Sequence, residues 1–524
     1  MVVGPREGSV VESLRFVAQR ELTPGLMGGF HDLRAEGEPC PMPPGRRLLH
    51  LLHLSDIQLA DVKSPARYEW VNSFYGVPGF EELIPGYRAQ EFLVAHALVA
   101  MLRQFNEMTD GQERVCCIVT GDSIDNSQQN ELDNFVAAIG GGVVNLQSGD
   151  EAMSFVAAHG FGDSTYWHPE PGGDDYKKLW GFPTLEGLLA AAFGPIVSPG
   201  LGCDWYITNG NHELLVQGLG VTNAAAGSIV VGETKQLGPP DELDPNDALR
   251  LGVESPATLL DGGHGHEIAP DLNRHFIDRR TLAKAIRNAG GTPEGHGLVD
   301  DEHLYYSAEL NDEVLLIGLD TAFSWGGAEG AIDTGQARWL VKVLERYSSS
   351  HVREDGELIA SDGEDRLIIV AAHHPLSTLT NERAAMRPDF QLGDWLLATL
   401  LRFPNVIAFV NGHTHENRVR VHHGNGRQLL EVTTSALMDW PCEARSLEIT
   451  VDQEAIWVTG VMVNFEGVAT PRSDDLSTGG IAAWHRLLAA NAPALTLNPH
   501  LESEGKQQDR NFSYRIERPS WLHP

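Results

Sequence analysis

The stretch Leu51–Asp61, LLHLSDIQLAD, is an apolar run that ends in two polar residues separated by one residue. The apolar part has the composition of a buried β-strand, and side chains two residues apart on a strand point to the same side. Asp56 and Gln58 are therefore expected to point in one direction just past the end of a strand. A carboxylate and an amide oxygen placed in this way are able to hold a cation.

Four later apolar runs also end in clusters of Gly, Asp, Asn or His. They are Arg114–Asn126 (RVCCIVTGDSIDN), Asp204–Glu213 (DWYITNGNHE), Arg366–Pro375 (RLIIVAAHHP) and Asn405–Asn417 (NVIAFVNGHTHEN). Each pattern predicts a short strand followed by a loop. Helical patterns lie between some of the strands, at 87–108, 333–349 and 389–403. Strands that alternate with helices indicate an α/β protein that binds its ligand beyond the carboxyl ends of the strands.

The chain divides into three predicted parts. Residues 1–46 are rich in Gly and Pro and are expected to form an N-terminal extension over the surface. Residues 47–470 form the predicted catalytic domain, with two long insertions at about 127–203 and 218–303. Insertions of this length in a compact enzyme are usually functional loops or packed surface excursions. Residues 471–524 are expected to form a helix and a tail that pack on the outside of the catalytic domain.

The polar clusters at the strand ends contain carboxylates, amide oxygens and imidazoles. The candidate residues are Asp56, Gln58, Asp122, Asn211, His212, His373, His413 and His415. This mixture of donors suits a divalent transition metal ion such as Mn, Fe or Zn. Calcium and magnesium sites are built from oxygen ligands and do not need several histidines.

The order of the five motifs resembles the calcineurin-like metallophosphoesterase family. The motifs are Asp-x-Gln, where the family commonly has Asp-x-His, then Gly-Asp-x-x-Asp-Asn, Gly-Asn-His-Glu, His-His-Pro and Gly-His-Thr-His. The resemblance covers roughly residues 48–465, and five ordered motifs are far more specific than any single one. The segments YWHP, GFP, GHG and LDTAFSWGGAEGAIDTGQARWL further resemble a bacterial subgroup of that family. The family fold implies a four-layer α/β/β/α sandwich with two mixed β-sheets and long loop insertions.

The resemblance also implies a pair of divalent metal ions and a role for each residue. The implied metal ligands are Asp56, Gln58 and His415 for one ion, Asn211, His373 and His413 for the other, and Asp122 for both. The implied reaction is hydrolysis of a phosphate mono- or diester by a hydroxide that the metal ions activate. His212 matches the histidine that contacts the phosphoryl group or the leaving oxygen, and Asp125 matches the carboxylate that orients it. Because His212 suits protonation of a leaving alkoxide, diesters are slightly preferred.

Gln58 departs from the commoner family pattern, which has histidine at this position. An amide oxygen is a neutral and usually weaker ligand than imidazole. We therefore expect the first metal ion to bind more weakly, with a bias toward Mn or Fe over Zn. The alternative is that Gln58 does not coordinate the ion and water takes its place.

The sequence also offers candidates for substrate binding, which are Asn126, His374, Arg280 and His296. Arg279 or Arg280 could clamp a phosphate with paired hydrogen bonds. The alternative for each residue is ordinary loop packing or surface charge. Asp320, at the end of another apolar run, is expected to brace the loops and not to bind metal.

The net charge of −34, from 72 acidic and 38 basic residues, argues against nucleic acid and anionic membranes as partners. A small phosphorylated substrate is expected instead, and the sequence gives no prediction of the oligomeric state. No apolar stretch reaches the ~20 residues that span a bilayer. The first residues do not resemble a signal peptide, so a cytoplasmic location is expected, although an exported form without its leader would look the same.

Two other functions remain open. One is a catalytically weak or inactive binding or regulatory protein on the same scaffold, to which only Gln58 points. The other is a hydrolase that uses the same metal ions on a pyrophosphate or a phospholipid headgroup.

Overall fold

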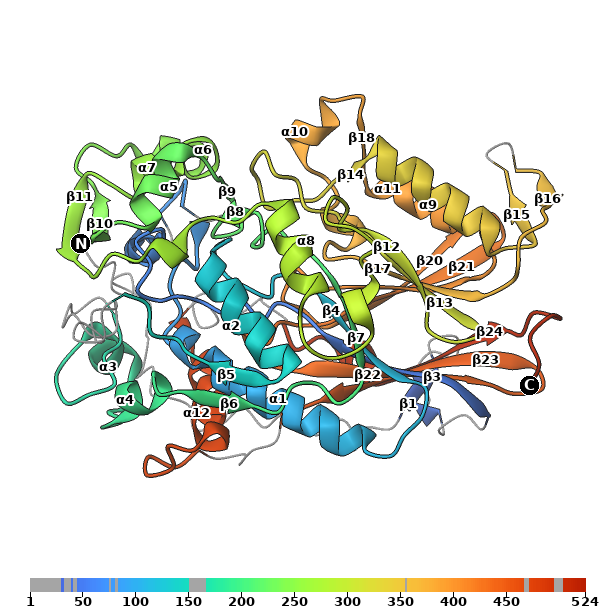
Figure 1. Ribbon diagram of the computed structural model, residues 1–524, viewed down its shortest axis with the longest axis horizontal. Helices are drawn as coiled ribbons and strands as arrows, with labels where there is room; N and C mark the ends of the chain where they lie inside the picture. The colour runs from blue at the N-terminus through green and yellow to red at the C-terminus, as the bar shows by residue number, and fades with distance from the viewer. Residues whose placement is uncertain are drawn as a thin grey trace, which may run out of the picture.

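The computed structural model describes residues 30–32, 39–40, 45–74, 77–80, 83–149, 166–353, 356–465, 471–493 and 503–524. Over these residues the protein is a mixed α/β structure with two large mixed β-sheets, one of eight and one of six strands (Figure 1). The α/β class and the mixed sheets predicted from the sequence are thereby confirmed.

The eight-stranded sheet contains the first three predicted strands as neighbours. Its order is β2 (Pro39–Cys40), β1 (Phe30–Asp32), β24 (Phe512–Glu517), β23 (Ala455–Val463), β22 (Ala444–Val451), β3 (Arg46–Leu54), β4 (Val115–Thr120) and β7 (Asp204–Thr208). The strands β3, β4 and β7 are parallel, so their carboxyl ends meet at one edge.

The six-stranded sheet contains the other two predicted strands. Its order is β12 (Tyr306–Glu309), β13 (Val314–Gly318), β17 (Leu367–Ala371), β19 (Val406–Asn411), β21 (Arg427–Thr433) and β20 (Arg418–Gly424). The strands β13, β17, β19 and β21 are parallel, and β12 and β20 are antiparallel to their neighbours.

Alternating side chains of the six-stranded sheet face two different apolar cores, because successive residues of a strand point to opposite faces. In β17, Leu367 and Ile369 belong to the core shared with the eight-stranded sheet. Ile368 belongs to a second core, which α9 (Thr334–Arg346) and α11 (Gly393–Leu400) cover. These helices match the patterns predicted at 333–349 and 389–403.

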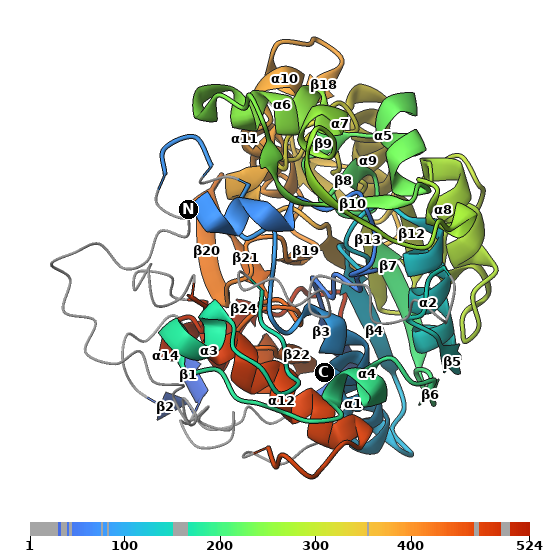
Figure 2. The same ribbon diagram turned by 90° about the vertical axis from the view of Figure 1, so that its left-hand side faces the viewer.

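The helices α1 (Val94–Thr109) and α12 (Thr478–Ala490) pack against each other. Figures 1 and 2 show this pair on the side of the eight-stranded sheet away from α9 and α11. The segment after α12 does more than pack outside, because residues 512–517 form β24 between β23 and β1. The division of the chain into parts at residues 46 and 470 stays a prediction.

The two insertions contain secondary structure of their own. The described part of 127–203 forms α2 (Gln129–Gly140), β5 (Gly142–Val144), α3 (Asp175–Trp180), α4 (Leu188–Ala192) and β6 (Ile196–Ser198). Residues 218–303 include β9 (Gly220–Val221), α5 (Ala224–Val230), β10 (Thr234–Pro240), α6 (Ala248–Glu254), α7 (Pro256–Leu259), β11 (Gly263–Glu267) and α8 (Arg279–Arg287).

The second insertion shares an apolar core with residues 66–83, and we call this core the insertion cluster. Its buried members are Ala66, Tyr68, Trp70, Val71, Phe80, Leu83, Val216, Leu219, Ala226, Val230, Ala248, Val253, Leu259 and Leu260. The insertion is therefore packed onto the segment that follows β3 and not suspended as a loose loop.

The remaining short strands and helices lie in the connections. They are β8 (Leu215–Val216), β14 (Ile332–Asp333), β15 (Ser350–Val352), β16 (Leu358–Ala360), β18 (Phe390–Gln391), α10 (Glu382–Ala385) and α14 (Gln507–Arg510). In the part of the chain that the structure describes, no helix is both long and apolar enough to cross a membrane.

Candidate metal centre

The two sheets bring their carboxyl ends together at one place. The imidazole Nδ1 of His373, after β17, donates to the backbone oxygen of Thr120 at the end of β4, at 2.7 Å. The backbone N–H of His413, after β19, donates to Oδ2 of Asp56 at 2.9 Å. These contacts join loops of one sheet to loops of the other, and the seven predicted ligands lie around the junction.

Five of these seven residues have a left-handed backbone, which is unusual outside glycine. The φ angles are 49° at Asp56, 47° at Gln58, 49° at Asp122, 68° at His413 and 55° at His415. Such conformations cost about 1–3 kcal/mol each and cluster at sites where function requires them. Here each loop turns sharply just past its strand.

Two glycines allow the loops to approach closely enough. A Cβ atom on Gly412 would lie 1.8 Å from Oγ of Ser55, and one on Gly210 would lie 2.1 Å from Oδ1 of Asp122. Any larger residue would therefore push the loops of β7 and β19 away from the carboxylates of Asp56 and Asp122.

The surroundings of His373 suit a bound cation. Because Nδ1 of His373 donates to a backbone oxygen, its Nε2 carries a lone pair in the neutral ring. This Nε2 lies 3.0 Å from Oδ1 of Asn211, 3.1 Å from Nδ1 of His413 and 3.2 Å from Oδ2 of Asp122. Atoms that bind one ion at about 2.0–2.2 Å lie about 3 Å apart, so this spacing is that of ligands around a shared metal ion.

The first motif leaves two buried oxygens without a hydrogen bond among the described residues. They are Oδ1 of Asp56 and Oε1 of Gln58, whose side chains are 0% and 1% exposed. Oδ1 of Asp56 lies 3.3 Å from Nε2 of His415, and the amide nitrogen of Gln58 lies 3.4 Å from the same atom. Rotation of the amide by 180° places its oxygen there instead. Oδ2 of Asp56 already accepts hydrogen bonds from Ser55 and from the backbone N–H of His413, so Oδ1 is the oxygen of this carboxylate that is available to an ion.

The donors present therefore suit divalent metal ions, with imidazole, carboxylate and amide oxygen in the proportions that Mn, Fe or Zn accept. Asp56, Asp122 and His373 offer ligand atoms within 4.8 Å of one another. His373, His374 and His413 form a second group whose ligand atoms lie within 4.8 Å of one another. Both ring nitrogens of His374 are already bonded, however, to Oγ1 of Thr321 at 2.8 Å and to the backbone oxygen of Ala328 at 2.9 Å.

The charges of the site shift the pKa values of its histidines in opposite directions. Burial lowers the pKa of His373, but the negative charges of Asp122 and Asp56 outweigh it and raise the pKa to about 9. Burial lowers the pKa of His374 to about 3 and also lowers that of His413. A site that attracts a proton to His373 is a site with excess negative charge, which a metal ion would neutralise.

Asp439 supports the site although the sequence analysis did not select it. Its Oδ2 accepts a hydrogen bond from Nδ1 of His415 at 2.8 Å, and Nε of Arg88 donates to both of its oxygens, at 2.8 and 3.0 Å. A carboxylate behind a ligating histidine fixes the ring and increases its basicity. Burial lowers the pKa of His415, but its pairing with the carboxylates of Asp439 and Asp56 raises it to about 10.

We expect Asp439→Asn to weaken metal binding at the His415 side by about 10–100-fold, because the ring of His415 loses its charged partner. Competition with a chelator, followed by metal analysis, measures the change. Asp300→Asn is the control, since Asp300 forms a similar pair with His303 at 3.1 Å on the surface. Equal metal affinity of both variants would contradict the role of Asp439.

His212 is held by the backbone of Asp125 and not by its carboxylate. Nδ1 of His212 donates to the backbone oxygen of Asp125 at 2.5 Å, whereas Oδ1 of Asp125 lies 3.9 Å from the same nitrogen. The Asp125 carboxylate instead pairs with the buried guanidinium of Arg67. This hydrogen bond leaves Nε2 of His212 as the atom that faces the other site residues, 3.2 Å from Nε2 of Gln58.

A cavity of about 200 Å³ opens onto this centre. Its polar lining includes Gln58, Asp122, Asn211, His212, His413 and His415, together with Arg88, Asp125 and Gln217. The rest of the lining includes the apolar residues Leu83, Ile84, Pro85, Leu219 and Ala328, and Tyr68, whose buried hydroxyl has no hydrogen bond among the described residues. The candidate ligands and a space for a small molecule therefore coincide.

The four candidates for substrate binding lie elsewhere or are already occupied. The amide of Asn126 is buried, donates to the backbone oxygen of Ala66 and accepts from the backbone of Gln217. His296 is 0% exposed and stacks on Trp205 with ring centroids 3.5 Å apart. Arg280 and His296 do not line the cavity, and the ring of His374 is bonded as described above.

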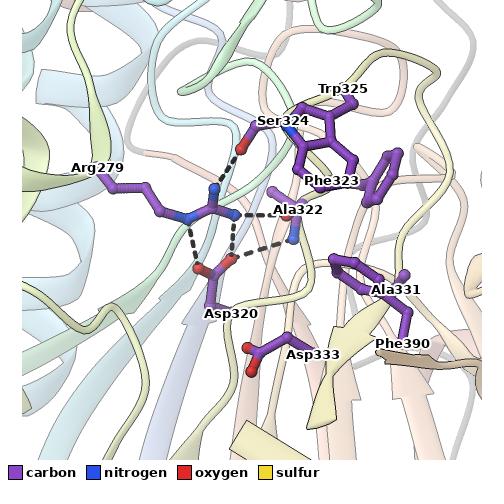
Figure 3. Close-up of a pocket in the computed structure, with 9 residues that line it drawn as sticks. All are labelled: Arg279, Asp320, Ala322, Phe323, Ser324, Trp325, Ala331, Asp333 and Phe390. Atoms are coloured by element: carbon purple, nitrogen blue, oxygen red, sulfur yellow. Dashed lines mark hydrogen bonds and ion pairs between the residues drawn. The ribbon is translucent and has the colours of Figure 1, made fainter. Parts of the chain in front are cut away.

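Arg279 lines a separate cavity of about 270 Å³, shown in Figure 3. Its guanidinium is held by Asp320 at 2.9 Å, by Ser324 and by the backbone oxygen of Ala322 at 2.6 Å. Asp320 also accepts a hydrogen bond from Asn209 at 3.1 Å. Asp320 thus ties together the loops after β7 and β13 and the start of α8, as a bracing residue would.

Comparisons with known proteins give only distant structural likeness. No family model matches the chain, and no curated protein matches it. Among solved structures, the chain resembles PhoD, with 10% identity, a TM-score of 0.29 and coverage of 81% of this chain and 70% of that chain. It also resembles the sulfate thiohydrolase SoxB of Thermus thermophilus in complex with glycerol, with 11% identity, a TM-score of 0.28 and coverage of 88% and 62%. At these scores the likeness carries no argument, so any assignment of function to this protein depends on the side chains of the site.

Proposed function

We propose that the protein is a metal-dependent hydrolase of phosphate esters, built on the four-layer fold of the calcineurin-like metallophosphoesterases. The observation that carries the proposal is the convergence of seven candidate ligand side chains from five strand ends, with buried oxygens of Asp56 and Gln58 that accept no hydrogen bond among the described residues. One metal ion would be held by Asp56, Gln58 and His415, the other by Asn211, His373 and His413, and Asp122 would contact both.

Divalent ions in this centre would polarise the phosphoryl group and lower the pKa of water, which supplies a nucleophile near neutral pH. The chain's own contribution is to neutralise charge and to orient the ester. Nε of Arg88 is fixed by Asp439, and among the described residues no hydrogen bond engages its Nη1 and Nη2. Arg88 lines the cavity and is therefore suited to hold a phosphoryl oxygen with these two groups.

His212 is the proposed proton donor to the leaving oxygen. The backbone oxygen of Asp125 fixes the proton on Nδ1, so that proton exchange takes place at Nε2, the nitrogen on the side of Gln58 and Asp122. General acid catalysis of this kind contributes about 10²–10⁴-fold to a rate. Asp125 acts through His212 and is a positioning residue.

Turnover of p-nitrophenyl phosphate and bis(p-nitrophenyl) phosphate with added Mn, Fe or Zn tests the proposal. We expect metal-dependent hydrolysis, with the diester slightly preferred, and loss of activity with a chelator. A folded protein that binds metal but hydrolyses neither ester would favour a binding or regulatory protein on the same scaffold. Activity on a pyrophosphate or a phospholipid headgroup alone would favour the other alternative.

We expect Gln58→His to raise the affinity for Zn at the His415 side about tenfold, because imidazole is the stronger ligand for this ion. Titration of the variant and the wild type against a chromogenic chelator measures the difference. Binding of the second ion serves as the internal control, since its ligands are unchanged. If the affinity for the first ion does not change, Gln58 is not a ligand.

A further inference from the structure

Part of the lining of the active-site cavity is apolar. It is built from Leu83, Ile84 and Pro85 on one segment and from Leu219 and Ala328 on two others. Leu83 and Leu219 are 6% and 7% exposed, so each presents only a small part of its surface to the cavity. A ligand in this space therefore meets methyl and methylene groups as well as the polar groups of the candidate ligands.

This wall is one surface of the insertion cluster, to which Tyr68, Leu83 and Leu219 belong. Ile84 and Ala328 are partly buried and pack against the same cluster. Gln217 ties the wall together, because its Oε1 accepts from the backbone N–H of Tyr68 and its Nε2 donates to the backbone oxygen of Gly86. The amide of Gln217 is thus committed to the wall. The insertion at 218–303 contributes Leu219 to the wall and packs behind it through the insertion cluster.

Beyond the proposed metal ions, the lining offers few positive groups to a second anionic group of a ligand. Among the described residues that line the cavity, Arg88 is the one lysine or arginine, and its charge is already shared with Asp439. Asp122 and Asp125 add negative charge to the lining. A second anionic group on a ligand would lie against apolar side chains or near carboxylates, and burial of an unpaired charge is costly.

We propose that the substrate is a compact phosphate ester whose organic group is uncharged and apolar, of the size of one aryl ring or a short branched alkyl chain. This inference rests on the proposed hydrolysis and assigns the organic group to the wall of Leu83, Ile84 and Leu219. The cavity of about 200 Å³ is smaller than the about 300–1,000 Å³ of pockets that enclose drug-sized ligands. Nucleotides and sugar phosphates that carry a second phosphate are excluded from the class.

The first test compares phenyl phosphate with 4-carboxyphenyl phosphate, or their methyl diesters if diesters are preferred. The two phenols leave with similar ease, so the added carboxylate reports on the wall. We expect kcat/KM to be about 10–100-fold higher for the phenyl ester, because the side chains of Leu83, Ile84 and Leu219 offer the carboxylate no partner. Equal kcat/KM, or a preference for the charged ester, would overturn the inference.

The second test introduces a cation into the wall with Ile84→Lys. We expect this variant to lower kcat/KM for the phenyl ester and to raise it for the carboxyphenyl ester, so that their ratio falls about tenfold or more. A gain for one substrate cannot arise from misfolding. Ile229→Lys is the matched control, because Ile229 packs partly buried on the same cluster but does not line the cavity. An unchanged ratio in Ile84→Lys, or an equal fall in the control, contradicts the inference.

Failure of the proposed hydrolysis gives a different result. If no ester is turned over with any metal, the proposed hydrolase activity is wrong. The apolar wall is then tested by the binding of phenylphosphonate and 4-carboxyphenylphosphonate to the metal-loaded protein. Tighter binding of phenylphosphonate, measured by calorimetry, supports the apolar wall. Equal binding overturns it.

Discussion

Asp122→Asn is expected to abolish metal-dependent ester hydrolysis and to weaken the binding of both metal ions. Oδ2 of Asp122 lies 3.2 Å from Nε2 of His373, and its Oδ1 accepts from the backbone of His212 at 2.9 Å. The neutral amide removes one negative charge from the site that we propose to hold two divalent ions. Loss of about 4 kcal/mol of transition-state stabilisation corresponds to about 10³-fold in rate.

The measurement is kcat/KM over a range of Mn concentrations, together with the metal content of the dialysed protein. Asp133→Asn is the control, because Asp133 is an exposed acid on α2 that accepts hydrogen bonds from Gln129 and Asn273. The control should keep wild-type activity. Full activity of Asp122→Asn would exclude Asp122 as a shared ligand, and so would undiminished binding of both ions.

The five strands and their polar ends were predictable because both signals are local. A run such as VCCIVTGD, at 115–122, shows a buried strand and the residues that follow it within eight positions. The carboxyl ends of parallel strands meet at one edge of a sheet, so local patterns were sufficient to place Asp56, Asp122 and Asn211 together. The contacts between the sheets, such as His413 with Asp56, follow from the resemblance and not from any local pattern.

The supporting residues could not be predicted because their roles depend on partners far along the chain. Asp439 stands in an irregular loop, ALMDWP, and its role is defined by His415 and by Arg88, which lies 351 residues before it. The carboxylate of Asp125 was predicted to orient His212, but its Oδ1 lies 3.9 Å from Nδ1 of that ring. The carboxylate of Asp125 instead pairs with Arg67, which lies in the segment after β3.

His296 illustrates the opposite error, in which a polar residue in a long insertion suggests a ligand. Its ring nitrogens lie 3.2 and 3.3 Å from the backbone oxygens of Trp205 and Ala289. The insertion at 218–303 contributes the apolar side chain of Leu219 to the cavity. An apolar residue of this kind gives no signal of function in the sequence. A sequence pattern shows which residues are chemically able to act, whereas the fold decides which of them face the cavity.

Arg67→Met is expected to lower the free energy of unfolding by about 3–5 kcal/mol, because it leaves buried carboxylates without their cation. Nε of Arg67 donates to Glu69 at 2.9 Å and Nη2 to Glu91 at 2.8 Å, while Nη1 pairs with Asp125. All four side chains are at most 1% exposed. Lys235 also pairs with Glu69, at 2.9 Å, so Glu91 and Asp125 lose the most.

Urea unfolding followed by far-UV circular dichroism measures the change, and Arg250→Met is the matched control. Arg250 lies on the surface of α6, and its pairs with Asp247 and Glu254 are solvent-exposed, so its loss should cost less than about 1 kcal/mol.

The variant Arg67→Lys should lose an amount of unfolding free energy between those of Arg67→Met and Arg250→Met. An ammonium group keeps the charge but does not reach three carboxylates at once. Since Asp125 holds His212 through its backbone oxygen, Arg67→Lys should also lower kcat more than it raises KM. If Arg67→Met were as stable as the control, the carboxylates would have to be protonated in the folded protein, and Arg67 would not fix Asp125.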